Sequence, residues 1–169
     1  MKRLFFALWP DNATRKQIAK INQSIYSEGL RKVKPDNLHV TLVFLGNVDT
    51  ELEAIIHLGM KNISVQAFSI CFDQLAFWRK PRLLCLTAQQ YDQQLLILVD
   101  ALKKELEQYG MMMEDRAYKA HITLARKAHR LVEIEMQPIT WQAQSFCLIE
   151  SLSTPDGVHY QVLQRWDFK

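Results

Sequence analysis

A four-residue motif, His-x-Thr-Leu, occurs twice in this chain, each time inside an apolar segment. The first copy is His39-Val-Thr-Leu42 and the second is His121-Ile-Thr-Leu124. Side chains alternate between the two faces of a β-strand, so each histidine shares a face with its threonine. The sequence therefore predicts two strands, each with one apolar face to bury and one polar face that carries an imidazole and a hydroxyl.

The segments before the two motifs also match each other. Each motif follows an apolar strand and a long helix; Leu4 precedes His39 by 35 residues and Leu84 precedes His121 by 37. A repeated unit of this size predicts two similar lobes within one domain that covers residues 1–169. If a twofold axis relates the lobes, both histidines and both threonines line one cleft.

The hydrophobic periodicity predicts three helices with one apolar face each. Asp11 or Asn12 can cap the first helix, and Thr50 forms a capping box with Glu53 at the start of the second. Gly110 suits the end of the third. The helices are expected over residues 12–29, 50–60 and 91–109, and strands over 4–9, 38–46, 68–72, 82–87, 120–126, 146–152 and 160–166, the last two forming a hairpin.

Two histidines in one cleft suit acid–base chemistry on a phosphodiester. Imidazole titrates near pH 6.5, so one ring can take a proton from a nucleophile while the other gives one to a leaving group. The hydroxyls of Thr41 and Thr123 can donate hydrogen bonds to the non-bridging oxygens between the rings. The residues alone leave open which of His39 and His121 is the acid. Neither a metal nor a cofactor is expected, because no cluster of carboxylates and histidines is evident.

The motifs and their surroundings resemble the two-histidine phosphoesterase superfamily, in particular the RNA 2′,3′-cyclic phosphodiesterases, or 2′-5′ RNA ligases of the LigT type. The resemblance runs nearly end to end and includes the segments 3–7, 36–46 and 121–126. Relatives often have proline where this chain has Ala120. The resemblance implies an α+β fold that is bilobal and duplicated, with two antiparallel sheets flanking a central cleft and helices on the outside.

The resemblance also implies an activity and roles for individual residues. The reaction would be hydrolysis of a 2′,3′-cyclic phosphate at an RNA end to a 2′-phosphomonoester, with reversible 2′-5′ ligation as a further reaction. His39 would be the general acid on the leaving 3′ oxygen, and His121 the general base on water. Thr41 and Thr123 would hold the phosphoryl oxygens.

Three further residues are candidates for substrate binding. Arg126 matches an arginine that can hold the phosphate in the family, but strict alternation places it opposite His121, so it needs a bulge to reach the cleft. Phe44 and Tyr118 can stack on a nucleobase, or they can pack in the core. A basic turn and three other histidines are expected to be solvated or structural: Arg79, Lys80 and Arg82; His57, His129 and His159.

Charge and composition leave the substrate partly open. The chain has 21 Lys and Arg against 18 Asp and Glu, a net charge of +3, which permits an anionic ligand without a polybasic tail. The three cysteines have no metal-ligand spacing, which fits a reducing cytoplasm. No apolar run is long enough to span a membrane. A monomer is expected. The alternatives are a non-catalytic RNA-end binding module and a phosphodiesterase for small cyclic-phosphate nucleotides or 2′-5′ oligonucleotides.

Overall fold

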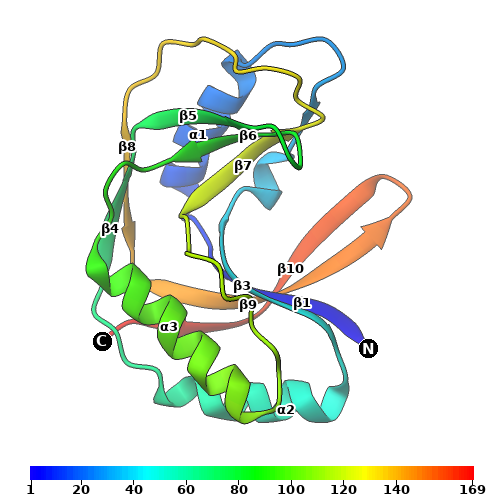
Figure 1. Cartoon of the computed structure of the whole chain (residues 1–169), viewed down its shortest axis with the longest axis vertical. Helices are drawn as coiled ribbons and strands as arrows, with labels where there is room; N and C mark the ends of the chain where they lie inside the picture. The colour runs from blue at the N-terminus through cyan, green and yellow to red at the C-terminus, as the bar shows by residue number, and fades with distance from the viewer.

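The computed structural model describes residues 1–169, and its strands form two antiparallel sheets (Figure 1). The strands are β1 (Lys2–Leu8), β2 (Arg31–Lys32), β3 (Val40–Val48), β4 (Phe68–Phe72), β5 (Gln74–Trp78), β6 (Leu83–Thr87), β7 (His121–Arg126), β8 (Ile139–Ala143), β9 (Ser145–Thr154) and β10 (Gly157–Asp167). The large sheet has the order β10-β9-β1-β3-β7-β6-β5, with β2 paired to β7, and the small sheet pairs β4 with β8. The predicted α+β fold with antiparallel sheets is confirmed.

Three α-helices and two short 3-10 turns connect the strands. They are α1 (Asn12–Ser24), α2 (Thr50–Gly59), α3 (Gln93–Gln108), η1 (Pro35–Asn37) and η2 (Met60–Asn62). Helix α1 ends five residues before Gly29, because Ile25 has extended backbone and turns its side chain into the core. The predicted cap of α2 is wrong: the side chain of Asp49 accepts from Leu52 N at 2.8 Å, and Thr50 is already helical. Asp11, one of two candidates, caps α1.

The duplicated unit expected from the sequence is visible as β1-α1-β3 and β6-α3-β7. The two motif strands, β3 and β7, are neighbours in the large sheet but share only one residue pair, Val40 with Ile122. The large sheet therefore divides at this pair into one half with β10, β9, β1 and β3, and another with β7, β6 and β5. The small sheet of β4 and β8 is separate from both halves of the large sheet.

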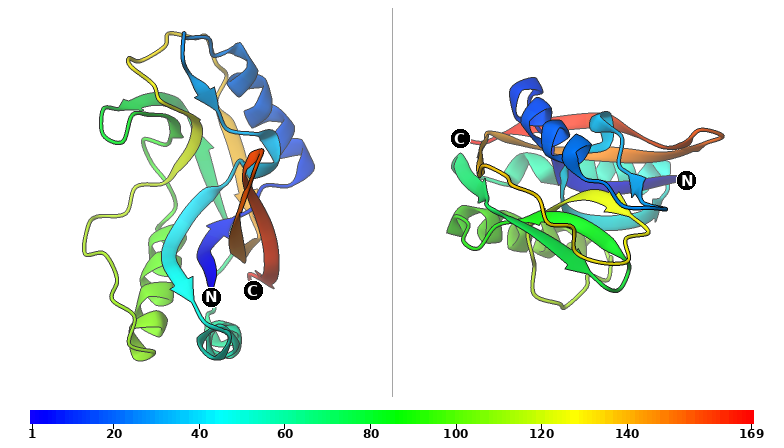
Figure 2. Two further views of the ribbon diagram at one scale, coloured as in Figure 1. Left: turned by 90° about the vertical axis from the view of Figure 1, so that its right-hand side faces the viewer. Right: turned by 90° about the horizontal axis from the view of Figure 1, so that it is seen from above.

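The last two strands form the predicted hairpin, which projects from the body of the molecule in orthogonal views (Figures 1 and 2). Strands β2, β5 and β8 were not predicted. In β8 the signal was present, since Ile139, Trp141 and Ala143 are buried and the residues between them are exposed. Strand β5 has no such alternation: four of its five residues are partly buried, as befits the edge of a sheet.

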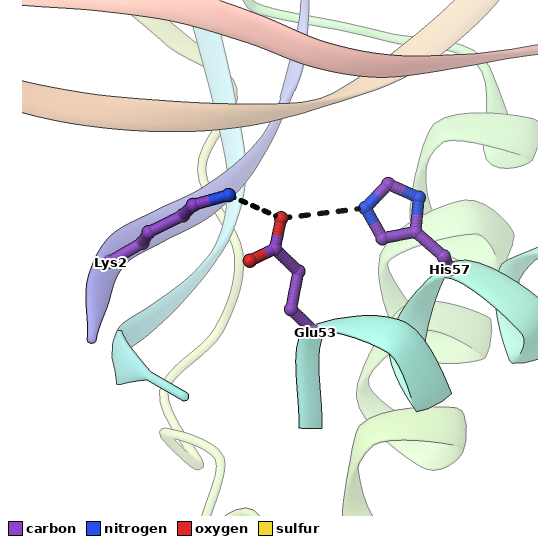
Figure 3. Close-up of polar contacts among 3 residues, drawn as sticks. All are labelled: Lys2, Glu53 and His57. Atoms are coloured by element: carbon purple, nitrogen blue, oxygen red, sulfur yellow. Dashed lines mark hydrogen bonds and ion pairs between the residues drawn. The ribbon is translucent and has the colours of Figure 1, made fainter. Parts of the chain in front are cut away.

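One cluster of 34 buried hydrophobic residues runs through the structure and includes side chains from all three α-helices. Figure 3 shows how α2 is attached to β1: Lys2 Nζ donates to Glu53 Oε1 at 2.8 Å, and His57 Nε2 lies 3.8 Å from the same oxygen. The ring of His57 also lies beside Trp166, so this histidine belongs to a structural contact. None of the helices combines the length and the apolar character that a membrane crossing requires.

Candidate active site

The pairing of Val40 with Ile122 brings the two motifs together. Both side chains are fully buried and face the core, so the histidine and threonine of each motif lie on the opposite face of the sheet. A local twofold axis passes through any such antiparallel pair, and here it relates His39 to His121. Both histidines therefore lie on this polar face, one residue before each member of the pair. The pairing therefore brings both imidazoles and both motif hydroxyls to one place on this face.

Both motif strands have a bulge at the same motif position. The register shows that Leu42 in β3 and Leu124 in β7 each lack a partner on the adjacent outer strand. An extra residue of this kind changes the face on which the following side chains lie. Phe44 and Arg126, each five residues after a motif histidine, consequently lie on the polar face and line the cavity described next. This is the bulge that Arg126 required.

One cavity of about 690 Å³ is lined by six of the seven predicted site residues: His39, Thr41, Phe44, His121, Thr123 and Arg126. The seventh, Tyr118, does not line it; its hydroxyl donates to the backbone oxygen of Thr41 at 2.9 Å. Tyr118 therefore ties the segment before β7 to the other motif strand. A second cavity of about 450 Å³, beside the start of α1, contains none of the seven.

Backbone carbonyls fix the same tautomer in both histidines. Nδ1 of His39 lies 2.7 Å from the carbonyl oxygen of Asn37, and Nδ1 of His121 lies 2.9 Å from that of Lys119, in each case two residues earlier. A carbonyl only accepts, so Nδ1 carries the hydrogen and Nε2 is the basic atom of the neutral ring. In His39 this atom lies 2.9 Å from the Thr41 hydroxyl, whereas in His121 it has no partner within the protein.

The two rings have different surroundings. One aromatic side chain, Trp78, lies against His121 with a centroid distance of 4.5 Å. Three lie against His39: Phe5 and Tyr160 at 5.1 Å, and Trp9, nearly parallel, at 5.8 Å. His39 is therefore the more enclosed of the two histidines, and His121 the more accessible to a small nucleophile.

These surroundings set the protonation of the two rings. Burial lowers the pKa of His39 to about 4; the backbone hydrogen bond opposes this, and the positive charges of His121, Arg126 and Arg15 reinforce it. Burial also lowers the pKa of His121, again against a backbone hydrogen bond and with a contribution from Arg116. Both rings are consequently neutral at pH 7 in the ligand-free protein, and a bound anion would raise both pKa values.

The rim of the cavity is strongly basic. Asp156 is the only carboxylate among the lining residues, against seven Lys and Arg side chains: Arg3, Arg31, Lys32, Lys34, Lys80, Arg116 and Arg126. Of the basic turn noted in the sequence, only Lys80 reaches the cavity. Arg82 instead donates to the backbone oxygen of Ala128 at 3.1 Å and contacts His129. Most of the rim cations come from β1, β2 and loops, where no local motif marks them.

Side chains that ligate metals are not clustered, since no group of three or more His, Cys, Asp or Glu residues lies together. The three cysteines are free thiols, and Cys85 and Cys147 are buried. Burial raises the pKa of both thiols to about 11, so neither is a thiolate at neutral pH. Among the groups that line the cavity, His39 and His121 supply the two imidazoles.

Comparisons with known proteins identify the family of the chain. A family model described as LigT like phosphoesterase matches residues 8–85. The RNA 2′,3′-cyclic phosphodiesterase of Escherichia coli (strain K12) is 31% identical, over 98% of this chain and 96% of that protein. The one from Archaeoglobus fulgidus is 28% identical, over 96% and 98%. The crystal structure of E. coli LigT in apo form superposes with a TM-score of 0.88 at 29% identity, over 99% of this chain and 97% of that one. The chain therefore belongs to the LigT-like phosphoesterase family.

Proposed function

We propose that this protein hydrolyses 2′,3′-cyclic phosphate ends of RNA to 2′-phosphomonoesters. The observation that carries the proposal is the single pair of Val40 and Ile122, which brings two motifs 82 residues apart into one basic cavity. The relatives named RNA 2′,3′-cyclic phosphodiesterase support the reaction, and a structure of E. coli LigT complexed with 3′-AMP supports a nucleotide ligand. Ligation would be the same displacement with a 5′ hydroxyl in place of water: its oxygen bonds to phosphorus, the 3′ oxygen leaves, and a 2′-5′ phosphodiester forms.

The proposed reaction is a single in-line displacement at phosphorus. Nε2 of His121, which has no partner in the ligand-free protein, accepts a proton from water while the water oxygen bonds to phosphorus. The bond from phosphorus to the 3′ oxygen breaks, and Nε2–H of His39 supplies the proton that this oxygen needs. The products are a 2′-phosphate and a free 3′ hydroxyl. Thr41 and Thr123 donate to the non-bridging oxygens, and Arg126 balances their charge.

The contact between His39 and Thr41 allows His39 to become protonated when substrate binds. In the neutral ring, Nε2 accepts a hydrogen bond from the Thr41 hydroxyl at 2.9 Å. The phosphate anion favours the imidazolium, whose Nε2–H becomes a donor. The Thr41 hydroxyl is then free to donate to the phosphate, so binding of the anion and protonation of His39 support each other.

Two of the predicted binding residues take more specific roles in this proposal. Phe44 lies in the cavity with 63% of its surface exposed, so its ring can stack on the base next to the cyclic phosphate. Tyr118 acts indirectly, since its hydroxyl is already bonded to Thr41 O and holds the strand that carries the first motif.

The test is an RNA oligonucleotide with a 2′,3′-cyclic phosphate end, incubated with the protein in EDTA. Conversion to a 2′-phosphate end is expected, as mapped by resistance of the product to a 3′-phosphate-specific phosphatase. Loss of activity in EDTA that a divalent metal restores would contradict the metal-independent mechanism. Tight binding without turnover would indicate a non-catalytic RNA-end binding module instead.

A pH profile tests the protonation states. The reaction needs one neutral and one protonated ring, and kcat/KM reports pKa values of the free enzyme. Because both pKa values are lowered, kcat/KM is expected to rise through pH 4 and to fall as the pH increases above 6.5. The descending limb of kcat should lie at higher pH, because the bound anion stabilises the imidazolium. A kcat/KM that stays constant or increases between pH 6.5 and 8 would contradict the proposed ionisation.

Small cyclic-phosphate nucleotides are the second candidate substrate, and the basic rim favours oligonucleotides over them. A single strand that contacts three rim cations should show a slope of about −2 when log kcat/KM is plotted against log salt concentration. A nucleoside 2′,3′-cyclic phosphate has no further phosphates and should show a shallower slope. Equal slopes for the two substrates would mean that the rim does not bind the strand.

A further inference from the structure

Asn37 lies buried between the first motif and the projecting hairpin, with 8% of its surface exposed. It is the last residue of η1 and precedes His39 by two positions. Its backbone oxygen accepts the hydrogen bond from His39 Nδ1 at 2.7 Å. The same residue is therefore the one that fixes the tautomer of the enclosed histidine.

The side-chain amide of Asn37 binds the hairpin through both of its polar atoms. Nδ2 donates to the backbone oxygen of Val158 at 2.8 Å, and Oδ1 accepts from the backbone nitrogen of Tyr160 at 3.2 Å. Both partners are in β10, on the stretch of hairpin that lines the cavity. One residue thus connects the imidazole, through its main chain, to the hairpin, through its side chain.

The part of the hairpin that Asn37 binds carries a ring that encloses His39. The phenol of Tyr160 stands edge-on to the imidazole, at 5.1 Å and 89°. The equivalent position in the second motif has no such clamp, because Lys119 is exposed and offers His121 only its backbone oxygen. This difference accounts for part of the contrast between the enclosed and the open histidine.

We infer that Asn37 is a positioning residue, which clamps the β9–β10 hairpin over His39 and holds the imidazole in the orientation that delivers its proton. The inference deepens the proposed function and rests on it for the role of His39. The other titratable or charged groups that face His39 are His121 and Arg126 from β7, Arg15 from α1, and Tyr160 itself. Asn37 changes none of these charges directly, so its effect is one of burial and orientation.

The first test is the variant Asn37→Ala, measured in cyclic-phosphate hydrolysis. With the hairpin loosened, kcat should fall by about 10-fold or more, because a misplaced acid loses its alignment with the leaving oxygen. KM should stay within about twofold, since the threonines and the rim cations that bind the phosphate are unchanged. Faster amide hydrogen exchange at Tyr160 is expected in the same variant.

The second readout is independent of turnover. A loosened hairpin exposes the imidazole to water, so the pKa of His39, titrated by NMR in the free protein, should move from about 4 toward 6.5. A matched control is Asn22→Ala, which removes a buried asparagine that does not itself line the cavity; its amide touches the lining residue Val33 only at the backbone oxygen, at 2.9 Å. That variant should lose stability without changing kcat or the pKa of His39.

A second variant covers the case in which Asn37→Ala does not fold. Asn37→Asp keeps the volume and the acceptor for Tyr160 N but cannot donate to Val158 O, and kcat should fall in it as well. A folded variant of either kind with the wild-type kcat would overturn the inference. If the wild-type protein itself does not turn over cyclic phosphates, the proposed function fails, and the pKa of His39 in Asn37→Ala still tests the clamp.

Discussion

Replacement of His121 by alanine should lower kcat for cyclic-phosphate hydrolysis by about 10²- to 10⁴-fold, the usual contribution of a general acid or base. His39→Ala should have an effect of the same size. The threonines and the rim cations remain in both variants, so KM should change much less than kcat. Removing His39 leaves the Thr41 hydroxyl without its acceptor, and removing His121 takes away the proposed base.

The measurement is steady-state hydrolysis by each variant, with thermal unfolding recorded to show that the variant is folded. His57→Ala is the matched control, because this histidine contacts Glu53 and Trp166 and does not line the cavity. It should retain full activity. A folded His39→Ala or His121→Ala protein with activity near that of the wild type would show that the imidazoles do not move the protons.

A substrate with a sulfur leaving atom can show which histidine is the acid and which is the base. In a substrate whose 3′ oxygen is replaced by sulfur, the leaving group departs as a thiolate. It needs no protonation, because a thiol has a pKa near 8.5. This substrate should restore much of the rate of His39→Ala and little of the rate of His121→Ala. Rescue of His121→Ala alone would reverse the two assignments.

The sequence was sufficient to predict the strands that carry the two motifs and the longest helix. Each motif has period-two alternation around a buried Val40 or Ile122, and alternation alone places His39 with Thr41 and His121 with Thr123. Helix α3 was predicted to within two residues at each end, because its five buried side chains follow the helical period. These features depend on local patterns, which a single sequence displays.

The features that depend on register could not be predicted. A bulge at Leu42 or Leu124 is defined by a partner strand, so nothing in the motif itself shows that Phe44 and Arg126 turn into the cavity. The clamp at Asn37 depends on β10, more than 120 residues away. Lys34 and Arg31 reach the rim only because the chain folds β2 against β7 and η1 against the hairpin. Long-range pairing of this kind leaves no local signal.

The largest loss of stability should come from Phe6→Ala, which removes a fully buried ring from β1 in the middle of the large sheet. The ring packs against Phe146 at 5.9 Å and Trp166 at 6.0 Å, and neither neighbour can fill the space without leaving its own contacts. A truncation of this kind costs about 3–5 kcal/mol. Urea unfolding followed by tryptophan fluorescence measures the change.

Phe44→Ala is the control for Phe6→Ala, and it should show the opposite combination of effects. Phe6 and Phe44 lie on neighbouring strands, but Phe6 faces the core and the bulge turns Phe44 into the cavity. Because Phe44 is 63% exposed, its loss should change the free energy of unfolding by only about 0.5 kcal/mol. It should instead weaken RNA binding by about 1–3 kcal/mol, the contribution of one stacked base. A large loss of stability in Phe44→Ala with unchanged KM would mean that the ring packs in the core, and that the bulge does not deliver it to the substrate.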